Sequence, residues 1–103
     1  MSKIVAGLVI VTALLSGSVF AGDPEAGKAK SMICAACHGM DGKSVIDGYP
    51  NLAGQNEKYI ISSIKAYRSK QRTGGNAAIM QPQAAILNDQ DIENLAAYYS
   101  QMK

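Results

Sequence analysis

The pattern of apolar and polar residues predicts an all-α domain with three helices and two irregular segments, preceded by an apolar start. Helices are predicted over about residues 24–36, 57–69 and 89–102, and each follows an aspartate or asparagine that suits the N-cap. The second and third helices have apolar stripes at helical spacing, which indicate one buried face each. These stripes are Ile60, Ile61, Ile64 and Tyr67, and Ile92, Leu95, Ala96 and Tyr99.

Two segments lack a helical period and are predicted as loops. Residues 39–55 contain four glycines and Pro50, and a loop of this length in a small domain usually serves a function. Residues 77–87, with the sequence A-A-I-M-Q-P-Q-A-A-I-L, are apolar without a period. This composition indicates a segment that is buried against a flat surface.

Residues 1–21 have the features of a signal peptide. Lys3 provides a positive start, residues 4–15 form an apolar run of 12 residues, and cleavage is expected after Ala21. The run is shorter than the roughly 20 apolar residues of a membrane-spanning helix, so an uncleaved anchor is the less favoured alternative. We expect export to the periplasm and a mature domain over residues 22–103, without stable membrane insertion after cleavage.

The expected mature domain has 82 residues, of which 9 are basic and 8 are acidic. This balance lacks the clustered excess of lysine and arginine that is typical of proteins binding nucleic acid or anionic membranes. A domain of this size buries only about 60% of the surface of its unfolded chain and is marginally stable. Because small domains usually need an added source of stability, a tightly bound cofactor would agree with the composition.

The strongest chemical signal is the segment Cys34-Ala35-Ala36-Cys37-His38. The spacing C-x-x-C-H is typical of the attachment site of a c-type haem. Two thiols on one helical turn can each add to one haem vinyl group, and His38 can supply an axial nitrogen to the iron.

Two other interpretations of this segment have less support. A thiol–disulfide centre would need a strand before the cysteines, and no strand pattern precedes them. A zinc site needs three or four ligands. The chain has only two cysteines and one histidine, and the adjacent Cys37 and His38 would crowd one metal.

With these residues, the chain resembles class I cytochrome c over the whole of residues 22–103. The matching phrases are C-A-A-C-H-G-M-D-G-K-S, Y-P-N-L-A-G-Q and the closing L-A-A-Y-Y. They are most like those of small bacterial single-haem cytochromes of the c-four type. The resemblance implies a fold of three to four helices wrapped around one covalently bound haem, with Gly27 and Tyr98 forming the contact between the first and last helices.

The resemblance also implies roles for five residues. Cys34 and Cys37 would bind haem c through two thioethers, and His38 would be the proximal iron ligand. The carbonyl of Pro50 would accept a hydrogen bond from the second ring nitrogen of His38. Met80 would be the sixth ligand of the iron.

Met80 could instead be a packing residue, because methionine is also common in apolar cores. Met32 and Met40 flank the haem motif and Met102 ends the last predicted helix, whereas Met80 lies in a mid-chain segment that could reach the opposite face of the haem. Many relatives have a second methionine three positions later, where this chain has Gln83. No second methionine could therefore replace Met80 here.

Together these features predict a periplasmic one-electron carrier, and not an enzyme, that serves membrane-bound or soluble respiratory redox proteins. With His38 and Met80 both bound, the iron would have no open position for oxygen or peroxide. The partner surface is expected around the haem edge, near residues 77–86. The alternative is a haem enzyme or gas sensor with five-coordinate iron, in which Met80 is not bound.

Overall fold

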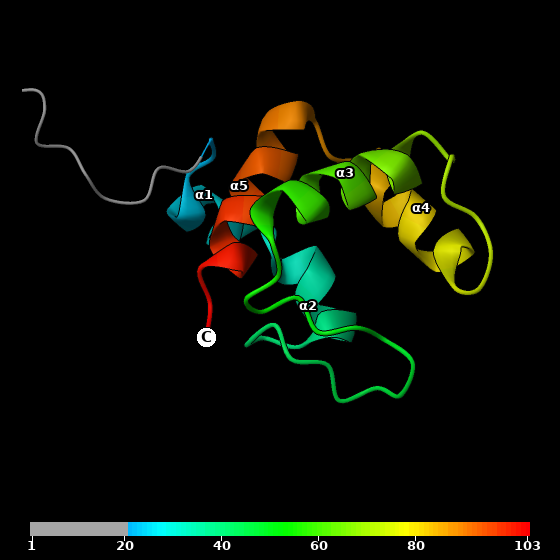
Figure 1. The fold of residues 1–103 in the computed structure, drawn as a ribbon, viewed down its shortest axis with the longest axis horizontal. Helices are drawn as coiled ribbons and strands as arrows, with labels where there is room; N and C mark the ends of the chain where they lie inside the picture. Colours follow the sequence, from blue (N-terminus) through cyan, green and yellow to red (C-terminus); the bar gives the residue numbers. More distant parts are fainter. Residues whose placement is uncertain (1–20) are drawn as a thin grey trace, which may run out of the picture.

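The computed structural model describes residues 21–103, so the expected signal peptide lies almost entirely outside the described residues. The described chain forms five helices and no strand (Figure 1): α1 (Pro24–Lys30), α2 (Met32–His38), α3 (Glu57–Arg68), α4 (Ala77–Ala85) and α5 (Asp89–Ser100). The predicted all-α class is confirmed, although the helices are more numerous than the pattern indicated. None of the five combines the length and the apolar character that a bilayer span requires.

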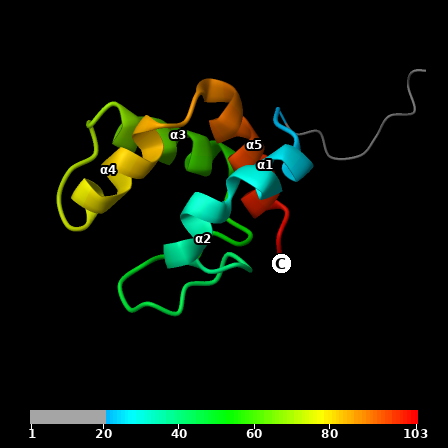
Figure 2. The same cartoon turned by 180° about the vertical axis from the view of Figure 1, so that it is seen from behind.

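Helix α5 lies between α1 and α3. Helix α3 packs against it in front in Figure 1, and α1 packs against it from behind, as the reverse view in Figure 2 shows. Helix α4 packs against α3. The helices that begin and end the described chain are therefore neighbours in space.

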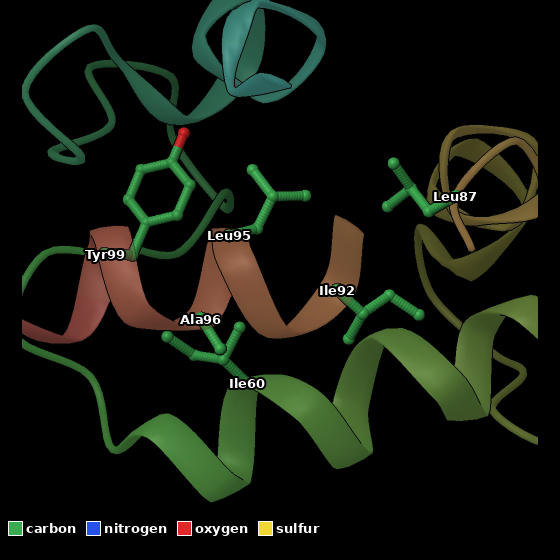
Figure 3. Packing of buried hydrophobic residues seen from close by; sticks show 6 residues of the cluster. All are labelled: Ile60, Leu87, Ile92, Leu95, Ala96 and Tyr99. Carbon is green, nitrogen blue, oxygen red and sulfur yellow. The ribbon is translucent and has the colours of Figure 1, made fainter. Parts of the chain in front are cut away.

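The apolar core lies on two sides of α5: Ile60, Ile92 and Ala96 lie between α3 and α5, whereas Leu95 and Tyr99 point away from α3 (Figure 3). Its buried side chains are Ile60, Leu87, Ile92, Leu95, Ala96 and Tyr99. The stripe predicted for the last helix is thus buried in full, and Ile61 and Ile64 of α3 pack against the cluster while remaining partly exposed. Each large apolar side chain buried here stabilises the fold by roughly 1.5–3 kcal/mol.

Gly27 forms the close crossing of α1 and α5. A Cβ atom at this position would lie 2.0 Å from the carbonyl oxygen of Asn94 and 2.8 Å from the Cβ of Tyr98. The two backbones can approach this closely only because residue 27 has no side chain. Beside the crossing, the N–H of Asp23 donates to Oδ1 of Asn94 at 2.8 Å. The expected contact between the first and last helices is confirmed.

The single helix predicted over residues 24–36 is wrong, because the chain breaks at Ser31. The Ser31 hydroxyl donates to the carbonyl oxygen of Lys28 at 2.7 Å, and the Ser31 N–H donates to the same oxygen at 3.2 Å. Serine side chains compete in this way for backbone partners and interrupt helices. The turn separates α1, which crosses α5, from α2, which carries the cysteines.

The loop predicted over residues 77–87 is also wrong, because most of it is helix α4. Pro82 and the lack of apolar residues at helical spacing indicated an irregular segment, yet Pro82 lies inside the helix. Alanine has the highest helix propensity, and four of the nine residues of α4 are alanines. The period is absent because a short helix that packs mainly through alanines needs no apolar stripe of large side chains.

The segment over residues 39–55 is irregular, as predicted. Its two ends are joined where the N–H groups of Leu52 and Ala53 donate to the Gly42 carbonyl at 2.7 and 3.0 Å. The N–H of Gly54 donates to the carbonyl oxygen of Tyr99 at 2.9 Å. These bonds attach the loop to α5 and return it beside α2.

Candidate functional site

Cys34, Cys37 and His38 lie together on α2. The two cysteines are three positions apart and therefore share one face of the helix. Both are half-buried and form no disulfide, and His38 is 7% exposed. The helix ends directly after His38 because Gly39 has a φ of +91°, and a Cβ atom there would lie 2.1 Å from the Lys43 carbonyl oxygen.

Burial disfavours the thiolate form of Cys34. Burial raises its pKa to about 11, with the neighbouring Cys37 adding to the rise and a hydrogen bond with Tyr99 opposing it. Thiols that exchange disulfides have a lowered pKa and are thiolates near neutral pH. A neutral, half-buried thiol therefore argues against a dithiol redox centre.

The ring of His38 is oriented by a backbone carbonyl. Its Nδ1 lies 2.8 Å from the carbonyl oxygen of Pro50, so the expected pair is present. A carbonyl can only accept, which assigns the proton to Nδ1 and leaves the lone pair of Nε2 available to a metal. The ring of Tyr49 lies nearby, with 6.3 Å between the ring centroids.

Ser44 and Asn51 link the loop that carries Pro50 to the end of α2. The side-chain oxygen of Asn51 accepts a hydrogen bond from the Ser44 N–H at 2.8 Å. The Ser44 hydroxyl in turn donates to the Cys37 carbonyl at 3.2 Å. Both residues lie within the phrases that resemble class I cytochrome c, but neither was predicted to act at the site.

Met80 lies half-buried on α4, a separate element from α2. The other candidate methionines are differently placed. Met32 and Met40 are 62% and 70% exposed. The sulfur of Met102 would lie 3.0 Å from a Cβ atom at Gly42, so it packs beneath the loop. Of the methionines considered in the sequence, Met80 is the one that is neither exposed nor packed beneath this loop.

The donor set fits a haem and does not fit a zinc ion. Within residues 21–103, no group of three or more histidine, cysteine or acidic side chains is arranged to bind a metal. The site instead offers two thiols on one helical turn and one imidazole with a free Nε2. This combination suits a metal that is brought by a covalently attached porphyrin.

Comparison with known proteins decides the family, because the model of the family described as cytochrome c matches residues 24–103. The chain belongs to the cytochrome c family. Cytochrome c-554(548) of Halomonas halodenitrificans is 58% identical over 80 residues, which are 78% of this chain and 96% of the relative.

Longer cytochromes are also similar. Cytochrome c4 of Pseudomonas aeruginosa is 36% identical over 103 residues, covering 100% of this chain and 50% of the relative. The crystal structure of reduced recombinant cytochrome c4 from Pseudomonas stutzeri has a TM-score of 0.70 and 38% identity, covering 81% of this chain and 47% of that chain. The present chain thus spans about half the length of these cytochromes c4.

Membership of this family confirms the expected cofactor and fold. The cofactor of a cytochrome c is covalently bound haem c, and Cys34-Ala35-Ala36-Cys37-His38 fits its attachment motif. The helical arrangement is the cytochrome c fold of the cytochrome c4 structures. The cytochrome is an electron carrier and not an enzyme, as the sequence predicted.

Proposed function

We propose that this cytochrome is a periplasmic carrier of single electrons between respiratory redox proteins, with its haem iron bound by His38 and Met80. The observation that carries the proposal is the 2.8 Å contact between Nδ1 of His38 and the Pro50 carbonyl. Such a bond determines the tautomer and makes the imidazole a stronger electron donor through Nε2. It is the arrangement expected of a permanent axial ligand.

Different residues of the site would attach the haem, bind its iron and set its reduction potential. Cys34 and Cys37 would form the two thioethers, and His38 would bind the iron on one face. Met80 would bind on the other face, where its soft sulfur favours reduced iron and so raises the reduction potential. When bound, haem c supplies an iron that cycles between the ferric and ferrous states.

Exposed apolar side chains on and beside α4 support a partner surface near this helix. Ile79 and Ile86 are 45% and 64% exposed. Encounters between redox proteins are brief and commonly bury less than about 1,200 Å² in total. Two exposed isoleucines beside polar residues suit such an encounter, in which the partners must separate after each transfer.

Absorption spectroscopy of the protein produced with haem maturation tests the ligand set. The ferric protein should show the weak long-wavelength band of sulfur-to-iron charge transfer, and Met80→Ala should abolish it. Met40→Ala is the matched control, because Met40 is exposed, and it should leave the band intact. A high-spin spectrum in the unmodified protein would instead favour the five-coordinate haem enzyme or gas sensor.

Cell fractionation tests the location. The haem-stained polypeptide should be released with the periplasmic fraction and should begin after Ala21. Recovery in the membrane fraction with an intact N-terminus would favour the uncleaved anchor instead.

A further inference from the structure

Helix α4, which carries Met80, has few local interactions that determine its position. It has nine residues, and isolated helices of this length are marginal in water. Its N-cap residue Asn76 makes no side-chain capping bond, and Pro82 inside the helix has no N–H to donate. Contacts with the rest of the chain must therefore decide where Met80 lies.

The apolar contacts of α4 are made by small side chains. Its buried residues are Ala77 and Ala84, and the next buried residue along the chain is Leu87. At this end of α4, the Arg68 guanidinium donates to the Leu87 carbonyl at 3.2 Å and to Asp89 at 2.6 Å. Contacts between buried methyl groups hold α4 against its neighbours but do not determine its exact position. The hydrogen bonds of Arg68 are made to residues that follow the helix. The middle of α4 needs a separate restraint.

Gln81, the residue next to Met80, supplies this restraint. Its Nε2 donates to the carbonyl oxygen of Arg72 at 3.0 Å. Arg72 is itself attached to α3, because its N–H donates to the Ala66 carbonyl at 3.1 Å and its guanidinium lies 4.6 Å from the ring centroid of Tyr67. A continuous set of contacts thus joins α3 to the residue beside Met80.

We propose that Gln81 is a positioning residue for Met80, acting through the Arg72 carbonyl to keep the methionine sulfur in reach of the iron. The inference rests on the proposed role of Met80 as the sixth ligand. A soft thioether binds ferric iron less well than ferrous iron. Loss of the Gln81 bond should therefore be detected first in the ferric protein.

The test measures binding of added imidazole to the ferric holoprotein, since imidazole competes with Met80 for the iron. In Gln81→Leu the apparent affinity for imidazole should rise roughly five-fold, which is the effect of losing one neutral hydrogen bond. Gln81→Glu keeps the shape of the side chain without its donor and should change in the same direction. This second variant keeps the test informative if the leucine variant folds poorly.

Gln83→Leu is the matched control. Gln83 is exposed on the same helix, and its side chain makes no hydrogen bond to other described residues. A gain in imidazole affinity in both Gln81 variants, but not in Gln83→Leu, supports the positioning role. Unchanged affinity in the Gln81 variants overturns it even if the melting temperature falls, because Gln81 would then only stabilise the fold.

An equal rise in imidazole affinity in Gln81→Leu and Gln83→Leu also overturns the positioning role. Loss of any polar side chain on α4 would then be enough to raise the affinity. If the unmodified ferric protein lacks the sulfur-to-iron band, both the proposed ligand set and this inference are wrong. If the band is present and the Gln81 variants bind imidazole as the unmodified protein does, only the positioning role is wrong. The two failures are therefore distinguishable.

Discussion

At the scale of single residues, the orientation of His38 depends on a carbonyl from a loop twelve positions away. The bonds of Ser44 to Asn51 and to the Cys37 backbone connect that loop with α2. An imidazole needs this kind of support because rotation of the ring would move Nε2 away from a metal. The Y-P-N-L phrase places the carbonyl acceptor of Pro50 next to Asn51, whose side chain accepts the hydrogen bond from Ser44.

Gly27 gives a residue-scale prediction. In Gly27→Val, the added Cβ would already overlap the backbone of α5 at Asn94, and the free energy of unfolding should fall by about 1–3 kcal/mol. Thermal unfolding should show a decrease in melting temperature of at least about 4 °C.

Ala29→Val is the control for Gly27→Val, because Ala29 is exposed on the same helix and receives the same branched side chain. It should change the melting temperature only slightly. If the two variants melt alike, the crossing at Gly27 does not restrict the side chain.

At the scale of elements, α5 and α4 differ in how much of their structure is specified locally. Asn88 and Asp91 form a reciprocal capping box, with bonds of 2.7 and 3.0 Å, and the apolar stripe of α5 is regular. Helix α4 has neither a side-chain cap nor a stripe. This contrast explains why the start and buried face of α5 could be predicted from the sequence, whereas α4 was mistaken for a loop.

The same contrast gives a prediction at this scale. Asn88→Ala removes the acceptor for the Asp91 N–H and should lower the free energy of unfolding by about 1 kcal/mol. Asn76→Ala is the matched substitution at the N-cap of α4, where the side chain makes no capping bond. It should lower the free energy of unfolding much less. Urea unfolding of both variants measures the difference. If the two substitutions lower the free energy of unfolding equally, the capping bond does not explain the stability of α5.

At the scale of the whole molecule, the polypeptide has a small apolar core. Half of the ten buried apolar residues within the described part of the chain are alanines, and the large side chains that are fully buried are Ile92, Leu95 and Tyr99. Alanine contributes little buried area, so these residues offset only part of the conformational entropy lost on folding. A covalently attached haem would add a large apolar surface to such a core.

Removal of the haem attachment should therefore prevent stable folding. The double variant Cys34→Ala with Cys37→Ala changes little side-chain volume but cannot form thioethers. We expect its far-ultraviolet circular dichroism to lose most of the helical signal and its thermal unfolding to lose cooperativity. A colourless double variant that unfolds cooperatively near the melting temperature of the holoprotein would show that the polypeptide core is sufficient by itself.

The sequence by itself determined the features that depend on neighbouring residues. The cap of α5 and the irregular loop before α3 follow from side chains within a few positions of one another. The cofactor class followed for the same reason, since C-x-x-C-H is a local arrangement on one helical turn.

Only the tertiary structure decided the break at Ser31, the helical state of α4 and the partners of Gln81 and Ser44. Ser31 can cap or interrupt a helix, and which one occurs depends on where α1 must meet α5. The alanine-rich segment of α4 becomes helical against α3, a surface that lies far away in the sequence. Contacts between distant segments have no local signature, and they determine how the chain surrounds its site.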